Sequence, residues 1–207
     1  MTLRALRVLK EVDLILAEDT RVTGKLLSHY EIDRPILTYQ QHTSDAKKAE
    51  ILGNLLTGNN IALVTDAGTP GISDPGNELI DFILQREALI QIIPIPGPSA
   101  ITSALSVSGF RSDKFLFLGF MPKKGKTKLF QWLKDGQVTF VFYESPHRIL
   151  KTLDLLESEF GNVSVVVARE MTKVYESIYR GTPLEVKEKL LKDPVKGEIV
   201  VVVEAKK

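Results

Sequence analysis

The sequence predicts an α/β protein of two domains, and three observations lead to that prediction. Short apolar runs rich in β-branched residues alternate with segments of helical periodicity along the whole chain. In the first half these runs, such as "IALV", are nearly continuous, which is typical of a parallel sheet covered on both faces. The composition changes around "GFRSDK" (109–114), so we expect an N-terminal domain at 1–111 and a C-terminal domain at 112–207.

In the first half, helices and strands are expected in alternation. Thr2 can cap a first helix, and Ser44 can cap a later helix that closes near Gly58. The expected strands are 13–19, 35–40, 61–66 and 89–95, and the expected helices after the first are 23–30, 44–58, 77–86 and 98–108. The chain opens with a helix, whereas every later helix of this half lies between strands, so we expect that a first strand is missing.

In the second half the pattern continues with strands and amphipathic helices. We expect strands at 115–120, 137–144, 162–170, 175–181 and 197–205, with helices that end near 134, over 145–160 and over 183–191.

Composition excludes several classes of protein. The net charge is only +1, so a nucleic-acid partner would be held by a local patch and not by the whole surface. The chain has no cysteine, which excludes disulfides and thiolate metal sites and fits a reducing cytoplasm. The three histidines lack metal-ligand spacing, so we expect no metal site. No apolar run approaches the roughly 18 residues of a membrane span, so we expect a soluble cytoplasmic protein without a membrane partner.

Three loops follow predicted strands and should meet at one crevice, because ligands of open α/β sheets bind beyond the carboxyl ends of the strands. They are "AEDTR" (17–21), "TDAGTPGISDPG" (65–76) and "PGPSA" (96–100). The second loop lacks the lysine that a phosphate-binding loop uses. Its two aspartates suit a ligand that carries a positive charge or many hydrogen-bond donors. Without a ligand, the loop could also be only a structural turn, in which Asp74 caps the following helix.

Other loops are open to two interpretations. Ser99 could face the crevice or cap a helix, and the charges of "AEDTR" could be a site or a salt-bridged helix start. Glu144 in "FYESPHR" (142–148) could be a general base or the partner of Arg148. The basic run Lys123, Lys124, Lys126 and Lys128 is a solvated turn or an RNA backbone contact.

Six segments in order resemble the small-subunit ribosomal RNA ribose 2'-O-methyltransferases of the tetrapyrrole methylase superfamily. They are "AEDTRVTGKLL", "TDAGTPGISDPG", "PGPSAITSALSVSGF", "FLGFMPKK", "FYESPHRILKTL" and "ARE-TK-YE". The resemblance implies two α/β domains with a mostly parallel first sheet and a mixed second sheet. It also implies S-adenosylmethionine in the cleft between the domains, and a homodimer. The partner would be small-subunit ribosomal RNA or the 30S particle, with a cytidine methylated on its ribose.

The resemblance also implies roles for individual residues. The methyl donor would be bound from the first domain by Asp66, Ala67, Gly68, Ser73, Ser99 and Ala100, and from the second by Tyr143, Arg169, Glu170, Gly197 and Ile199. Any base that removes the 2'-hydroxyl proton would be sought among Glu18, Asp19 and Glu144. The candidates for RNA contact are Arg21, Lys123, Lys124, Lys126 and Arg148.

At its N-terminus the chain departs from the resemblance, since those enzymes carry a further strand and a "TPIGN"-like loop before the helix that begins here. We expect this difference to weaken donor binding. Two alternative functions therefore stay open. One is methylation of a tetrapyrrole or another small molecule, and the other is a non-catalytic form that binds ribosomes.

Overall fold

The computed structural model describes residues 1–87, 89–192 and 195–204 and divides the chain into two compact units, Met1–Ser99 and Ala100–Lys207. The helix at Ala100–Ser106 therefore belongs to the second unit, whereas the sequence placed it before the boundary. Within the described ranges, no helix is long and apolar enough to cross a membrane.

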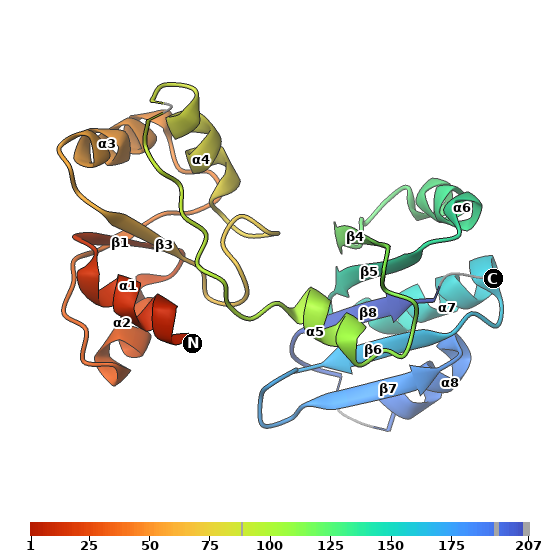
Figure 1. Ribbon diagram of the computed structural model, residues 1–207. Coiled ribbons are helices and arrows are strands. Elements are labelled where there is room, and N and C mark those ends of the chain that lie inside the picture. Colours follow the sequence, from red (N-terminus) through yellow and green to blue (C-terminus); the bar gives the residue numbers. More distant parts are fainter. Residues whose placement is uncertain (88, 193–194, 205–207) are drawn as a thin grey trace. The chain divides into compact units, whose positions relative to one another are not determined.

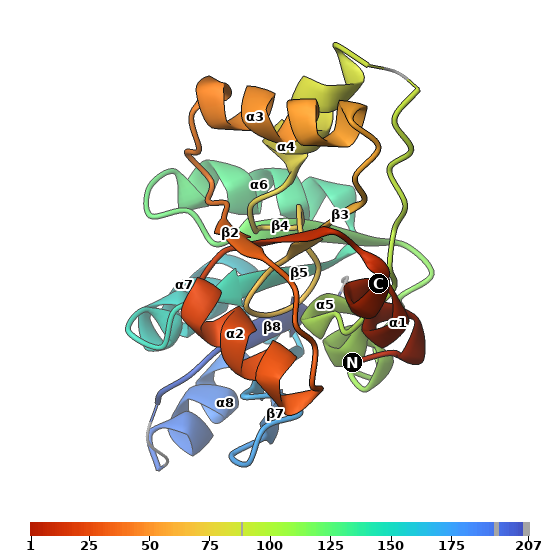
Figure 2. The ribbon, with the colours of Figure 1, turned by 90° about the vertical axis from the view of Figure 1, so that its left-hand side faces the viewer.

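The first unit is built on a parallel sheet of order β2-β1-β3 (Figure 1). Its elements are α1 (Leu3–Glu11), β1 (Leu14–Ala17), α2 (Thr20–His29), β2 (Ile36–Thr38), α3 (Asp45–Leu56), β3 (Ile61–Val64) and α4 (Asn77–Leu84). Helices cover both faces of the sheet, as Figure 2 shows with α3 and α4 on one side and α1 and α2 on the other. Ile15 packs with the α1 and α2 side and Leu16 with the α3 and α4 side, because successive residues of a strand face opposite ways.

The helix starts of this unit follow the predicted caps. The hydroxyl of Thr2 accepts a hydrogen bond from the Ala5 backbone at 3.1 Å, and that of Ser44 accepts one from Lys47 at 3.4 Å. Each satisfies a backbone N–H that the first turn of a helix leaves unpaired.

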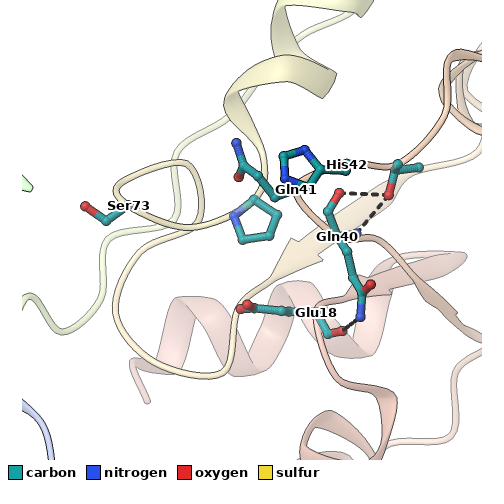
Figure 3. A pocket seen from close by; sticks show the side chains of 7 residues that line it. Glu18, Gln40, Gln41, His42 and Ser73 are labelled. Carbon is teal, nitrogen blue, oxygen red and sulfur yellow. Dashed lines mark hydrogen bonds between the residues drawn. The ribbon is translucent and has the colours of Figure 1, made fainter. Parts of the chain in front are cut away.

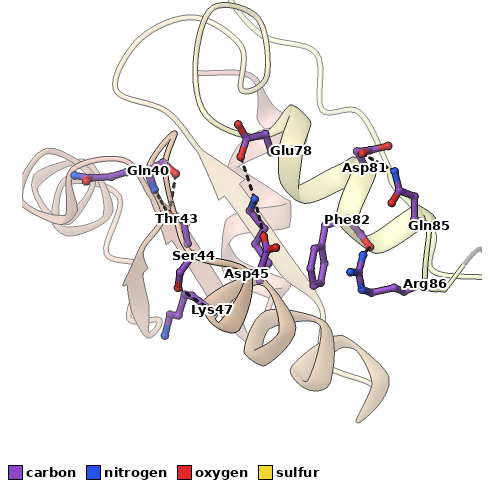
Figure 4. Close-up of polar contacts among 11 residues, drawn as sticks. Gln40, Thr43, Ser44, Asp45, Lys47, Glu78, Asp81, Phe82, Gln85 and Arg86 are labelled. Carbon is purple, nitrogen blue, oxygen red and sulfur yellow. Dashed lines mark hydrogen bonds and ion pairs between the residues drawn. The ribbon is translucent and has the colours of Figure 1, made fainter.

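A nearly buried lysine joins α3 to α4. Lys48 is 8% exposed, and its Nζ lies 3.0 Å from a carboxylate oxygen of Glu78 on α4 and 3.3 Å from Asp45 on α3. Figure 4 shows Glu78 extending toward α3, and Arg86, just after the end of α4, beside the ring of Phe82. The hydrogen bond to Glu78 raises the pKa of Lys48, so the lysine stays charged at neutral pH.

The expected strand at 89–95 is wrong. Residues 91–99 form no regular element, and Ile92 and Ile93 are 42% and 58% exposed. The β-branched residues there favour extended backbone, but a strand also requires a neighbour to pair with. Pairing depends on distant segments, so local composition could not decide it.

The second unit has a mixed sheet of order β4-β5-β8-β6-β7, in which only β4 and β5 are parallel. Its elements are α5 (Ala100–Ser106), β4 (Phe115–Phe120), α6 (Lys126–Gly136), β5 (Thr139–Glu144), α7 (Ile149–Phe160), β6 (Val165–Arg169), β7 (Ser177–Gly181), α8 (Pro183–Leu190) and β8 (Ile199–Val203). One face of the sheet packs on α6, α7 and α8, and the other packs on α5. The predicted parallel first sheet and mixed second sheet are confirmed.

Candidate functional site

The candidate site of the first unit lies where its parallel strands end. Ala17 of β1 is in register with Val64 of β3, so Glu18 and Thr65 leave the sheet side by side. The Thr65 hydroxyl donates a 2.7 Å hydrogen bond to the Glu18 carboxylate. Two of the three loops that were predicted to share a crevice, those after β1 and β3, therefore meet.

A cavity of about 500 Å³ opens beside Glu18, a volume typical of small-molecule sites. Its lining comes from three separate segments, as Figure 3 shows: Glu18, Gln40, Gln41, His42, Thr43, Ser73 and Pro75. The backbone N–H of Gln40 donates to the Thr43 hydroxyl at 2.9 Å, which holds the turn after β2.

Residues 40–43 were not among the predicted site residues. Their signal was available, because "QQHT" directly follows the β2 region and polar groups after a strand were the criterion used for the other loops. The cavity thus gains two amides and an imidazole that could donate or accept hydrogen bonds.

The glycine-rich loop 65–76 is fixed by its own backbone. The N–H of Gly71 donates to the Pro75 carbonyl at 3.1 Å, and that of Ile72 donates to Thr69 at 3.2 Å. Gly76 has φ of 146°, and a β-carbon there would lie 2.8 Å from Leu63 Cδ2. Ser73, which lines the cavity, has φ of 62°, an uncommon value for a residue other than glycine. The loop therefore has a defined backbone conformation and is not a flexible linker.

We predict that Gly76→Ala lowers the free energy of unfolding by about 1–3 kcal/mol, since the new methyl group combines a disfavoured φ with a clash against Leu63. Gly53→Ala is the matched control. Gly53 lies inside α3 with open space around it, so alanine there should stabilise the helix by about 0.5–1 kcal/mol. Urea denaturation of the two variants measures both values. Equal effects would show that the loop does not require glycine.

The pKa values of two carboxyl groups at this edge are shifted in opposite directions. Asp19 caps α2 and receives hydrogen bonds from Arg21 Nε at 3.0 Å and Nη2 at 2.6 Å. These hydrogen bonds lower the pKa of Asp19 to about 2. The pKa of Asp66 is raised, first by loss of water around its carboxyl and then by the nearby Glu18 carboxylate. Asp66 is thus poorly compensated, whereas Asp19 is already paired.

We predict that the two groups titrate in sequence across the acidic range in carboxyl-carbon NMR, Asp66 above the usual value and Asp19 at about 2. Because folding depresses the Asp19 pKa below its unfolded value of about 3.9, its stabilisation of α2 is present above that value and is lost as pH falls toward 2. Arg21→Gln should return Asp19 toward its ordinary value. An Asp19 midpoint near 4 in the unaltered chain would refute the pairing.

In the second unit, Glu144 lies at the centre of a closed polar cluster. Its side chain is fully buried, and one oxygen lies 2.6 Å from Arg148 Nη2 while the other accepts from the Thr152 hydroxyl at 2.6 Å and lies 3.9 Å from Lys126 Nζ. The Ser145 backbone donates to the first oxygen at 2.8 Å. Glu144 therefore pairs with Arg148, the second of the two interpretations left open.

Four of the predicted donor-binding residues gather at one end of β6 and β8. Arg169 pairs with Ile199 across the two strands. The Glu170 backbone N–H donates to the Glu198 carbonyl at 2.9 Å, and the Glu198 N–H donates to the Glu170 carboxylate at 2.8 Å. A β-carbon at Gly197 would lie 2.3 Å from the Glu170 carboxyl, and Gly197 has φ of 89°, so a larger residue there would displace the Glu170 side chain and strain the backbone. Tyr143 lies across β8 on β5, where its ring contacts Phe117 and Phe120 at centroid distances of 5.2 and 5.3 Å.

The remaining predicted residues lie in varied surroundings. Ala67 and Gly68 are exposed in the glycine-rich loop, and Ser99 directly precedes α5, whose first residue is Ala100. Among the RNA candidates, Lys123 and Lys124 are exposed. Arg21 pairs with Asp19, Arg148 pairs with Glu144, and Lys126 is directed into the Glu144 cluster.

A polar cavity at the carboxyl ends of a parallel sheet, with Glu18 in its lining, is the arrangement of an α/β protein that binds a small molecule. Residues 1–187 match the family model of the Tetrapyrrole (Corrin/Porphyrin) Methylases, and the chain belongs to this family. Family membership confirms the resemblance drawn from the sequence.

The chain is similar over nearly its whole length to curated proteins that are named as ribosomal RNA methyltransferases. A Synechocystis protein named ribosomal RNA small subunit methyltransferase I is 46% identical over 98% of this chain and 73% of its own length. A Thermotoga maritima protein of the same name is 45% identical over 100% of this chain and 92% of its own length.

Solved structures share the fold at low identity. The methyltransferase CobJ aligns with a TM-score of 0.70 at 17% identity, over 99% of this chain and 88% of that one. Cobalt precorrin-4 methyltransferase aligns with a TM-score of 0.69 at 16% identity, over the same shares of each chain.

Proposed function

We propose that this protein transfers a methyl group from S-adenosylmethionine to the ribose 2'-hydroxyl of a cytidine in small-subunit ribosomal RNA. The observation that carries the proposal is the polar cavity that Glu18 lines at the carboxyl ends of β1 and β3, in a chain whose 42–47% identical relatives bear the name ribosomal RNA small subunit methyltransferase I. The choice of cytidine and of the 2'-oxygen rests on the sequence resemblance.

The residues of this edge suit the donor. S-adenosylmethionine supplies a methyl group on a positively charged sulfur and also carries an amino group and a ribose diol. Asp66, beside the cavity, offers a carboxylate to such groups, and its raised pKa means that a nearby cation would relieve an unfavourable charge. Gly68 and Gly71 both have positive φ, a backbone conformation that residues with a β-carbon rarely adopt, so glycine permits the course of the loop here.

The three candidate bases are not equivalent. Asp19 is held by Arg21 and has a pKa of about 2, so it is a poor proton acceptor at neutral pH. Glu144 is enclosed by Arg148, Thr152 and the Ser145 backbone. Of the three, Glu18 lines the cavity. We therefore assign to Glu18 the role of accepting a hydrogen bond from the reacting hydroxyl and orienting it.

The assay uses 30S particles and S-adenosylmethionine labelled on its methyl group. We expect label in the small-subunit RNA, recovered after alkaline hydrolysis as a dinucleotide that begins with 2'-O-methylcytidine, because a methylated 2'-oxygen cannot attack the adjacent phosphate. Label on a base would contradict the 2'-O assignment. Label on a tetrapyrrole, with none on RNA, would favour the small-molecule branch.

The proposal extends to the second unit and to assembly. We propose that Tyr143, Arg169, Glu170, Gly197 and Ile199 also contact the donor, and that the protein acts as a cytoplasmic homodimer. The gathering of four of these residues at one end of β6 and β8 supports the first statement.

A further inference from the structure

An exposed tryptophan and three exposed lysines lie on α6 and in the turn directly before it. Trp132 is 58% exposed, and Lys128 lies four residues earlier on the same exposed face of the helix. Lys123 and Lys124 are exposed in the turn that leads into the helix. We name these four residues the α6 surface.

Lys126 differs from the other three lysines because its side chain is directed into the protein. Its side chain is 15% exposed, and its Nζ donates to the Thr152 hydroxyl at 3.1 Å and lies 3.9 Å from the buried Glu144 carboxylate. This contact anchors the first turn of α6 to α7 and β5. Lys123, Lys124 and Lys128 make no ion pair within the described part of the chain, so their charges remain available.

The charges around the α6 surface are mostly positive. Lys134 is directed elsewhere, since it pairs with Glu159 at 2.8 Å and lies over the ring of Phe160. Asp135 is the exposed acid next to Trp132, one turn further along α6. Along residues 123–135 the three exposed lysines thus outnumber the single acid, Asp135.

We propose that the α6 surface binds single-stranded RNA, with an unpaired base stacked on Trp132 and the adjacent phosphates contacted by Lys123, Lys124 and Lys128. The inference rests on the proposed function, which requires an RNA substrate, and it names the element that holds that substrate. Aromatic platforms flanked by basic side chains are how proteins bind single strands. A protein partner suits the surface less well, because lysine is depleted from protein interfaces.

The spacing on α6 agrees with this occupant. Lys128 and Trp132 are one turn apart, about 6 Å along the helix axis, so that a stacked base and a neighbouring phosphate can be engaged together. Phe120, 60% exposed at the end of β4, precedes the same turn and offers a second ring.

The test uses the fluorescence of Trp132, which is the single tryptophan of the sequence. A 12-nucleotide single-stranded RNA of mixed sequence should quench this emission, and the same RNA in a duplex should quench it far less. By anisotropy of a labelled oligonucleotide, Trp132→Ala should weaken binding about tenfold. Replacing Lys123, Lys124 and Lys128 by glutamine should lower the salt dependence of log K by about 2.

Lys192→Gln is the matched control, since Lys192 is exposed after α8, which packs at the opposite edge of the sheet from α6. It should leave binding unchanged. RNA binding that leaves the emission unaltered and survives Trp132→Ala would overturn this inference while methyl transfer to 30S particles still stood. Absence of both RNA binding and methyl transfer would overturn the proposed function together with it.

Discussion

Asp66→Asn is expected to lower the affinity for S-adenosylmethionine at least about thirtyfold, the equivalent of about 2 kcal/mol. Asparagine keeps the shape of the side chain and removes the charge that we place beside the cationic donor. The fold should not weaken, because the raised pKa of Asp66 shows that the folded chain already disfavours its ionised form. Calorimetric titration measures the affinity, and urea denaturation checks the fold.

Asp33→Asn is the control for this change. Asp33 is also exposed in the first unit, but it precedes β2 and so lies at the amino end of the strands. Its replacement should leave donor binding intact. If both variants bound the donor as the unaltered chain does, the acidic edge would not be the donor site.

Glu144→Ala is expected to lower the free energy of unfolding by about 3–5 kcal/mol. The change removes the acceptor that joins Arg148, Thr152 and Ser145, and it leaves two partly buried cations without their buried counter-charge. Such a loss would be measured in urea. Donor affinity per folded molecule should change much less than stability does.

Comparison of Glu144→Ala with a control variant distinguishes a structural role of Glu144 from a catalytic one. Glu188→Ala, at an exposed position on α8, should change stability by no more than about 0.5 kcal/mol. A Glu144→Ala protein with unaltered stability and abolished methyl transfer would contradict the structural role and restore Glu144 as a catalytic base.

Much of the fold was predictable because its signals are local. Thr2 and Ser44 cap helices as expected, and continuous apolar runs in the first half correspond to a sheet covered on both faces. The segment 89–95 was mispredicted because its β-branched composition is local while strand pairing is not. The place of α5 likewise depends on packing against β8, which the helix sequence alone does not state.

The candidate site was predicted in outline and not in its contacts. The rule that loops gather at the carboxyl ends of strands pointed to the loop of Glu18, which lines the cavity, and applied to β2 it would also have pointed to His42. The directions of charged side chains could not be predicted. Lys126 and Lys128 are two residues apart in one basic run, yet one is directed inward to Glu144 and the other is exposed, because the rotation of α6 on the sheet decides it.

The central claim is that the cavity lined by Glu18, with Asp66 beside it, holds the methyl donor for a reaction on ribosomal RNA. The most direct measurement is transfer of labelled methyl from S-adenosylmethionine to 30S particles by the unaltered chain and by Asp66→Asn, with the product nucleotide identified. We predict 2'-O-methylcytidine from the unaltered chain and a strong loss of it in the variant. Equal transfer by both proteins, or transfer by neither while 30S binding persists, would contradict the claim.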